Sequence, residues 1–195
     1  MGEAANGSAR SNEELWAFLA SLGTAEVAHT GGDFLHHLRA VHRVLEEAGA
    51  DEAVCRAGLF HSIYGTEGFQ DFSLPLAERA RVRALIGERA EFAAYCNCVM
   101  DRATLDAAVA AALRGGEQRF EIRDRAGGPS IALTRAQLAD LAEVHLFDWL
   151  EQVARSERGW GYRREAYRDM ATLVGRRAVA AYERVFAEEP SAGGG

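Results

Sequence analysis

The most constraining feature of the sequence is a nearly all-apolar segment, residues 53–63, which reads AVCRAGLFHSI. Asp51 precedes it and can cap a helix that begins there. A helix without a polar face must be covered by other elements on all sides. The chain of 195 residues is long enough to bury one substantial core. We therefore expect this helix at the centre of a single helical bundle.

Other segments have the apolar period of amphipathic helices. We expect these helices over about residues 11–23, 33–49, 75–87, 88–113 with a break near 101–104, 134–156 and 162–187. Ser11 and Glu14 form the pattern of a capping box at the first of them. The exception is residues 118–133, where apolar and polar residues alternate on either side of a Gly-Gly-Pro turn, as in a β-hairpin. The predicted fold is mostly α, with one small β-hairpin.

The two ends of the chain differ from the rest in composition. Residues 1–10 are small and polar, and residues 189–195 end in Ser-Ala-Gly-Gly-Gly, so we expect disordered ends around one domain over residues 11–188. Residues 1–10 lack the apolar run of a signal peptide, and no segment approaches the ~20 apolar residues of a membrane span. The three cysteines contain no CxxC pair, which favours a reducing compartment. A cytoplasmic protein without membrane contact is the expectation.

Charge narrows the choice of partners. The net charge of −7 argues against nucleic-acid binding, which requires clustered positive charge. All 22 basic residues are arginine, so a Schiff-base lysine and the lysine of a P-loop are excluded, and no nucleotide-cofactor motif is present. Arginine favours contacts to phosphate or carboxylate. A small-molecule substrate fits a chain with a net negative charge and many arginines, and a homo-oligomer is compatible with the same composition.

Histidines are the side chains best suited to chemistry here, because neutral imidazole is the commonest metal ligand and a general base near pH 7. Helical phase places His37 within the apolar stripe of residues 33–49. The same phase turns His36 to the opposite side and His42 about a quarter-turn away. We therefore expect His37 to face the interior and to share a ligand with His61, a ligand that His36 and His42 do not reach.

Three further histidines join this set. His61 stands near the end of the central apolar helix, His145 lies on the apolar stripe of residues 134–156, and His29 precedes the helix that carries His37. Each can be an ordinary core histidine satisfied by one hydrogen bond. Several inward-facing histidines in one small domain instead favour a common site.

Two stretches carry a resemblance to a known superfamily. The sequence HLRAV at residues 37–41, followed by AGLFHSIYGT at residues 57–66, resembles the first half of an HD domain. It is most similar there to the hydrolase domain of the bifunctional (p)ppGpp synthetase/hydrolase family. In that domain a His on one helix is followed by an apolar helix that ends in His-Asp. The 24-residue interval between His37 and His61 suits this arrangement.

A closer similarity is to an uncharacterised family of small bacterial and fungal proteins. Its pattern is like His-x-Gly-x-x-Leu-x-x-His-Leu, followed by Gly-Leu-Phe-His-Ser-x-Tyr-Gly-Thr-Glu. Residues 29–38 and 58–67 are similar to these two parts. The resemblance as a whole covers about residues 25–155, and residues 58–67 are its specific part. It implies an HD-domain-like helical bundle with a metal site.

The chain departs from the HD pattern at the acidic positions. Ser62 replaces the defining Asp, and Gly65 stands where the hydrolase loop has its acidic pair. The later Asp-x-x-x-Asn pair of those hydrolases aligns with Val144 and Asp148, with Asp148 at the Asn position. The resemblance then implies that only histidines of the usual metal set remain. A two-metal centre bridged by the HD aspartate is therefore not expected.

The residues and the resemblance together predict a mononuclear site for Zn²⁺ or Fe²⁺ with an open coordination position. The predicted metal ligands are His29, His37, His61 and His145, with Glu67 as an alternative fourth group. The predicted catalytic residues are His61, Tyr64 and Glu67. The predicted function is a metal-dependent hydrolase or an oxygenase-like tailoring enzyme acting on a small molecule.

Two other interpretations stay open. In the first, the pocket is metal-free, His61 or His37 acts as acid and base, and Tyr64 and Glu67 orient the substrate. In the second, the chain is a catalytically inactive HD-like module that binds a ligand or a partner. Residues 64–67 can also be simply the turn that follows a helix.

Overall fold

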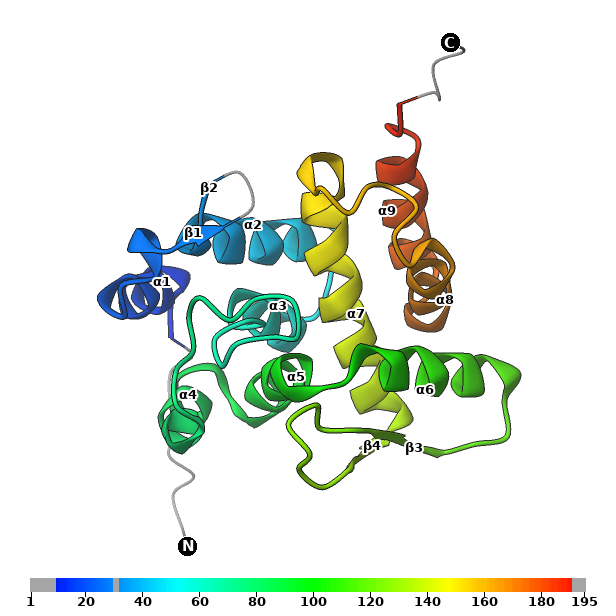
Figure 1. Ribbon diagram of the computed structural model, residues 1–195, viewed down its shortest axis with the longest axis horizontal. Coiled ribbons are helices and arrows are strands. Elements are labelled where there is room, and N and C mark those ends of the chain that lie inside the picture. Colours follow the sequence, from blue (N-terminus) through cyan, green and yellow to red (C-terminus); the bar gives the residue numbers. More distant parts are fainter. Residues whose placement is uncertain (1–9, 30–31, 191–195) are drawn as a thin grey trace, which may run out of the picture.

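The computed structural model describes residues 10–29 and 32–190 and is mostly helical (Figure 1), which confirms the predicted fold class. The α-helices are α1 (Asn12–Ser21), α2 (Phe34–Glu47), α3 (Glu52–Leu59), α4 (Arg79–Ile86), α5 (Glu88–Val99), α6 (Arg102–Arg114), α7 (Arg135–Gln152), α8 (Arg164–Val174) and α9 (Arg176–Phe186). Short 3₁₀ helices cover Thr24–Glu26, Leu76–Glu78 and Val153–Arg155. The predicted disordered ends lie outside the described residues, apart from residues 10, 189 and 190.

Two small antiparallel sheets accompany the helices. The predicted hairpin is present as β3 (Arg119–Ile122) paired with β4 (Ile131–Thr134). A second pair, β1 (Ala28–His29) and β2 (Gly32–Asp33), was not predicted, because strands of two residues leave no alternating pattern. β1 and β2 lead directly into α2 and place residue 29 beside that helix.

Local sequence explains where the helices begin. Ser11 and Glu14 form the predicted capping box at α1, and Thr134 forms another with Gln137 at the start of α7. Asp33 accepts a hydrogen bond from the backbone N–H of residue 36 and so caps α2. These caps satisfy backbone N–H groups that have no partner inside the helix.

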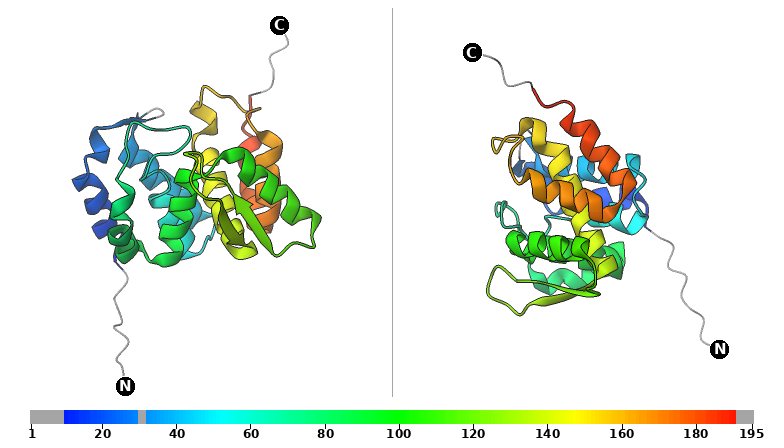
Figure 2. Two further views of the ribbon diagram at one scale, coloured as in Figure 1. Left: turned by 60° about the horizontal axis from the view of Figure 1, so that its bottom comes forward. Right: turned by 90° about the vertical axis from the view of Figure 1, so that its right-hand side faces the viewer.

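The centre of the fold is formed by α3 and α7. On one side of α7 lie α2, α3 and α5, and on the other lie α6 and α8, while the β3–β4 hairpin lies at the end where α7 begins (Figures 1 and 2). Gly58 lets α3 approach α2 closely, since a Cβ there would lie 2.3 Å from Leu45 Cδ1. Leu59, Phe60 and Ile63 are fully buried, which confirms that residues 53–63 are central.

Two predicted helices differ from the structure. The segment 162–187 is two helices, α8 and α9, because Gly175 has φ 120°, outside the helical region, and interrupts the chain between them. The central helix ends at Leu59, and residues 60–64 form successive turns. Among the described helices none is long and apolar enough to cross a membrane.

Candidate metal centre and its pocket

Three buried side chains from different parts of the chain meet at one point: His37 of α2, His61 just after α3, and Asp148 of α7. The Nε2 atoms of His37 and His61 are 3.2 Å apart. Asp148 Oδ1 lies 3.1 Å from Nε2 of His37 and 3.2 Å from Nε2 of His61. Ligands of a tetrahedral Zn²⁺ with bonds of about 2.0 Å are separated by roughly 3.3 Å. The triangle therefore has the size of one face of a single-metal coordination site.

Hydrogen bonds on the far side of each ring orient these atoms. The Gly58 carbonyl can only accept, so His61 Nδ1, 2.7 Å away, carries the hydrogen and Nε2 has the lone pair. His37 Nδ1 lies 2.8 Å from Glu151 Oε2, which fixes that ring in the same way. A carbonyl or carboxylate behind a histidine is the usual support of a metal ligand. The donor set thus fits a divalent metal ion.

The electrostatics of this triangle favour a positive charge. Burial lowers the pKa of His37, but hydrogen bonds to Asp148 and Glu151 outweigh it and raise the pKa to about 9. Burial also opposes ionisation of Asp148, yet the neighbouring His61 and His37 hold the pKa of its carboxyl well below the usual range. Two imidazoles and a carboxylate that share one point are stabilised by a cation, either a proton on His37 or a metal ion.

His29, predicted as a fourth ligand, lies beside this group, and its ring nitrogens are not among the atoms that meet at the triangle. Its ring stacks on His37, with ring centroids 4.2 Å apart and planes inclined by 14°. Its Nδ1 atom is buried and has no hydrogen-bond partner among the described residues. Burial and the neighbouring His37 lower the pKa of His29 to about 4, so this ring is neutral. His29 therefore forms a wall of the site.

His145 is also outside the group, and the prediction that it binds the metal was wrong. Its Nδ1 donates to Asn97 Oδ1 at 3.1 Å, and its Nε2 accepts from Arg163 Nη1 at 2.9 Å. Burial, with the positive charges of Arg102 and Arg163, holds the pKa of His145 well below its ordinary value. Since both ring nitrogens are occupied, His145 is a neutral structural residue. Asn97 connects it to the backbone carbonyl of His61, 2.9 Å away.

The two residues predicted to act with His61 point elsewhere. Tyr64 is buried against α5, and its hydroxyl donates to Glu91 Oε1 at 3.2 Å. Glu67 is exposed, and its carboxylate accepts from the backbone N–H of Arg102 at 3.0 Å, at the start of α6. Their predicted catalytic role is therefore corrected to a structural one. Ser62 lines the cavity that also contains His37 and Asp148.

The corrected role of Tyr64 gives a first prediction. Changing Tyr64→Phe removes one hydrogen bond to Glu91, which keeps its contacts to Arg79. We expect unfolding to become easier by about 0.5–1.5 kcal/mol, with unchanged metal binding. Urea denaturation and a Zn²⁺ titration of the same variant measure both quantities. If Tyr64→Phe lost metal binding at unchanged stability, Tyr64 would have to be part of the metal site.

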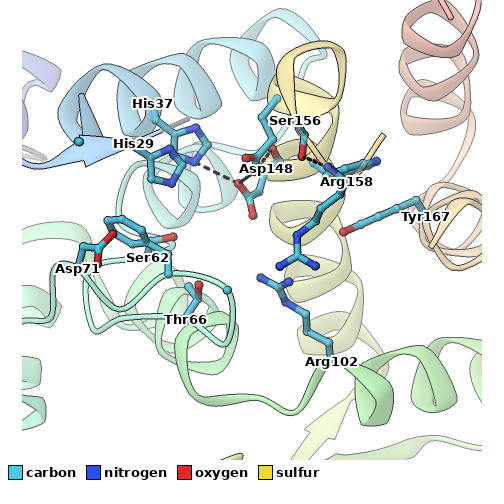
Figure 3. A pocket seen from close by; sticks show the side chains of 15 residues that line it. His29, His37, Ser62, Thr66, Asp71, Arg102, Asp148, Ser156, Arg158 and Tyr167 are labelled. Carbon is cyan, nitrogen blue, oxygen red and sulfur yellow. Dashed lines mark hydrogen bonds and ion pairs between the residues drawn. The ribbon is translucent and has the colours of Figure 1, made fainter. Parts of the chain in front are cut away.

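A cavity of about 260 Å³ opens from the triangle. It is smaller than the ~300–1,000 Å³ typical of sites for drug-sized ligands, so it suits a small molecule. Its lining includes His29, Thr66, Phe69, Asp148, Trp149 and Tyr167 (Figure 3). Two arginines, Arg102 and Arg158, lie at the end away from His29 (Figure 3).

Fold and site together define a mostly helical protein with a buried His₂Asp group that could hold one metal ion. A family model described as a domain of unknown function (DUF6817) matches residues 18–102. The matched segment contains His37 and His61 and ends before Asp148. No curated protein and no solved structure matches the chain.

Proposed function

We propose that the protein is an enzyme that holds one divalent metal ion, Zn²⁺ or Fe²⁺, on His37, His61 and Asp148 and acts on a small molecule in the adjoining cavity. The observation that carries the proposal is the triangle of ligand atoms, with sides of 3.1–3.2 Å and both histidines oriented by acceptors behind them. A histidine from each of two successive segments, then an aspartate of a later helix, also supports the HD-domain resemblance.

Hydrolysis is the reaction that we favour. A metal ion at this site would polarise a substrate oxygen and lower the pKa of a water molecule. His37 and His61 present their Nε2 atoms in fixed orientations, and Asp148, whose Oδ1 also accepts from Gln152 at 2.8 Å, supplies the negative charge. Ser62 and Thr66 give the cavity polar walls on the side opposite α7.

Oxygen activation is the second candidate, and one observation favours it. Two histidines and one carboxylate on one face of a metal site are the ligand set of non-haem Fe²⁺ oxygenases. The identity of the native metal separates the two candidates, since hydrolysis can proceed with Zn²⁺, which has no redox chemistry.

The experiment that tests the proposal is elemental analysis of the purified chain, followed by chelation and titration with Zn²⁺ and Fe²⁺. We expect one equivalent per chain, because Ser62 offers a neutral hydroxyl where a second metal would need a bridging carboxylate. Turnover of small-molecule esters, phosphoesters and amides should require that equivalent. Turnover that persists after chelation would support the metal-free interpretation, and two equivalents at full occupancy would contradict a mononuclear site.

A further inference from the structure

Two arginines meet within the cavity, away from His29. Arg102 is the first residue of α6, and Arg158 lies in the loop between α7 and α8. Their guanidinium groups point toward each other across the cavity (Figure 3). Side chains from two separate elements thus bring two positive charges to the same place.

Neither guanidinium is neutralised by a carboxylate within residues 10–29 and 32–190. Arg102 Nη1 donates only to the Tyr162 hydroxyl, at 3.4 Å, and the Arg158 guanidinium lies 4.7 Å from the centroid of the Tyr162 ring. The nearby Arg163 differs, because Asp106 holds it with two hydrogen bonds. Two facing positive charges repel unless an anion lies between them.

The surrounding groups suit an oxygen-rich anion. A guanidinium presents a planar fork of N–H donors that matches carboxylate and phosphate oxygens. Burial raises the pKa of Tyr167, which therefore keeps its proton, and its hydroxyl points toward Arg158 (Figure 3). Asp148, a carboxylate in the cavity lining, is already engaged by the two histidines.

We propose that Arg102 and Arg158 form an oxyanion subsite that binds a carboxylate or phosphate group at one end of the substrate. The substrate is then a small anionic molecule whose other end reaches His37, His61 and Asp148. The cavity volume of about 260 Å³ limits its size. The statement about the substrate rests on the proposed function, whereas anion binding by the two arginines does not.

Calorimetric titration with inorganic phosphate and with malonate tests the subsite. The purified full chain should bind at least one of these probes, and Arg102→Gln and Arg158→Gln should each weaken binding at least ~10-fold, as expected for loss of a charged hydrogen-bond donor. Arg168→Gln is the matched control, since Arg168 is exposed on α8 and does not line the cavity. Arg158 is exposed in a loop, so its substitution should leave the circular dichroism spectrum unchanged.

The outcomes separate this proposal from the metal site. Phosphate binding alone would assign the substrate to phosphate compounds, and malonate binding alone would assign it to carboxylates. The variant His61→Ala should lose the metal and still bind the anion. Anion binding by the two arginines is therefore tested separately from the proposed function. The proposal is overturned if the wild type binds neither probe at millimolar concentration, or if Arg158→Gln binds them as the wild type does.

Discussion

Replacing Asp148 with Asn should reduce the affinity for Zn²⁺ by at least ~100-fold. Loss of a group that only supports a ligand already costs 10–100-fold, and Asp148 is the one carboxylate in the triangle. The substitution retains the shape of the side chain and removes its negative charge. Competition between the protein and a chromophoric chelator measures the affinity.

The control for this experiment is Asp140→Asn on the same helix. Asp140 pairs with Arg89 on the outer face of α7, with Asp140 Oδ2 2.8 Å from Arg89 Nε. The Asp140→Asn variant therefore tests whether the loss of any negative charge on α7 is sufficient to reduce the affinity for Zn²⁺. Equal Zn²⁺ affinities for the wild type and the Asp148→Asn variant would exclude the proposed metal site.

Replacing Glu91 with Ala should lower the stability of the fold strongly. Glu91 is fully buried, and its two oxygens accept from Arg79 Nε at 2.6 Å and Arg79 Nη2 at 3.0 Å. In Glu91→Ala the Arg79 charge and the Tyr64 hydroxyl lose their partner. We expect a decrease in the free energy of unfolding of about 3 kcal/mol, at the lower end for a broken buried ion pair. The expected loss is at the lower end of that range because the Arg79 side chain keeps 24% exposure to solvent, which weakens the ion pair.

Glu88→Ala provides the comparison, because Glu88 lies on the same helix and is exposed. It should change the free energy of unfolding by less than ~0.5 kcal/mol. Urea denaturation of both variants gives the two values. If both variants unfold at the urea concentration of the wild type, the Arg79–Glu91 pair contributes nothing net to stability.

The sequence predicted most of the fold because its helices have clear periods and caps. The capping boxes at Ser11 and Thr134 are short-range features, so they are visible without the tertiary structure. The interruption at Gly175 was missed because apolar residues keep the helical period on both sides of it. A single glycine within such a pattern is also compatible with a continuous helix.

The candidate site was predicted only in part. His37 and His61 followed from helical phase and from the HD-domain resemblance, and the structure brings them together. Asp148 was missed because residues 141–150 of α7 are all buried, so phase cannot show which of them faces α2. A carboxylate at the centre of such a buried stretch is itself a signal, because an isolated buried charge is costly.

The error at Tyr64 and Glu67 has a related cause. Both follow His61 closely in the sequence, and this proximity suggested that they share its pocket. Because α3 ends at Leu59, the chain passes through successive turns in which neighbouring side chains point in different directions. Helical phase no longer applies there, and the direction of each side chain is set by tertiary contacts.

The distribution of the ligand atoms along the chain has a consequence for folding. His37 and His61 lie early in the sequence, whereas Asp148 arrives with α7, after the β3–β4 hairpin. The complete triangle exists only once α7 has docked, so a metal ion would bind the finished domain in preference to partly folded chains. At a free concentration of 100 times the dissociation constant, such an ion adds about 2.7 kcal/mol to stability. A bound ion would then act as a reversible cross-link that joins α2 and the segment after α3 to α7.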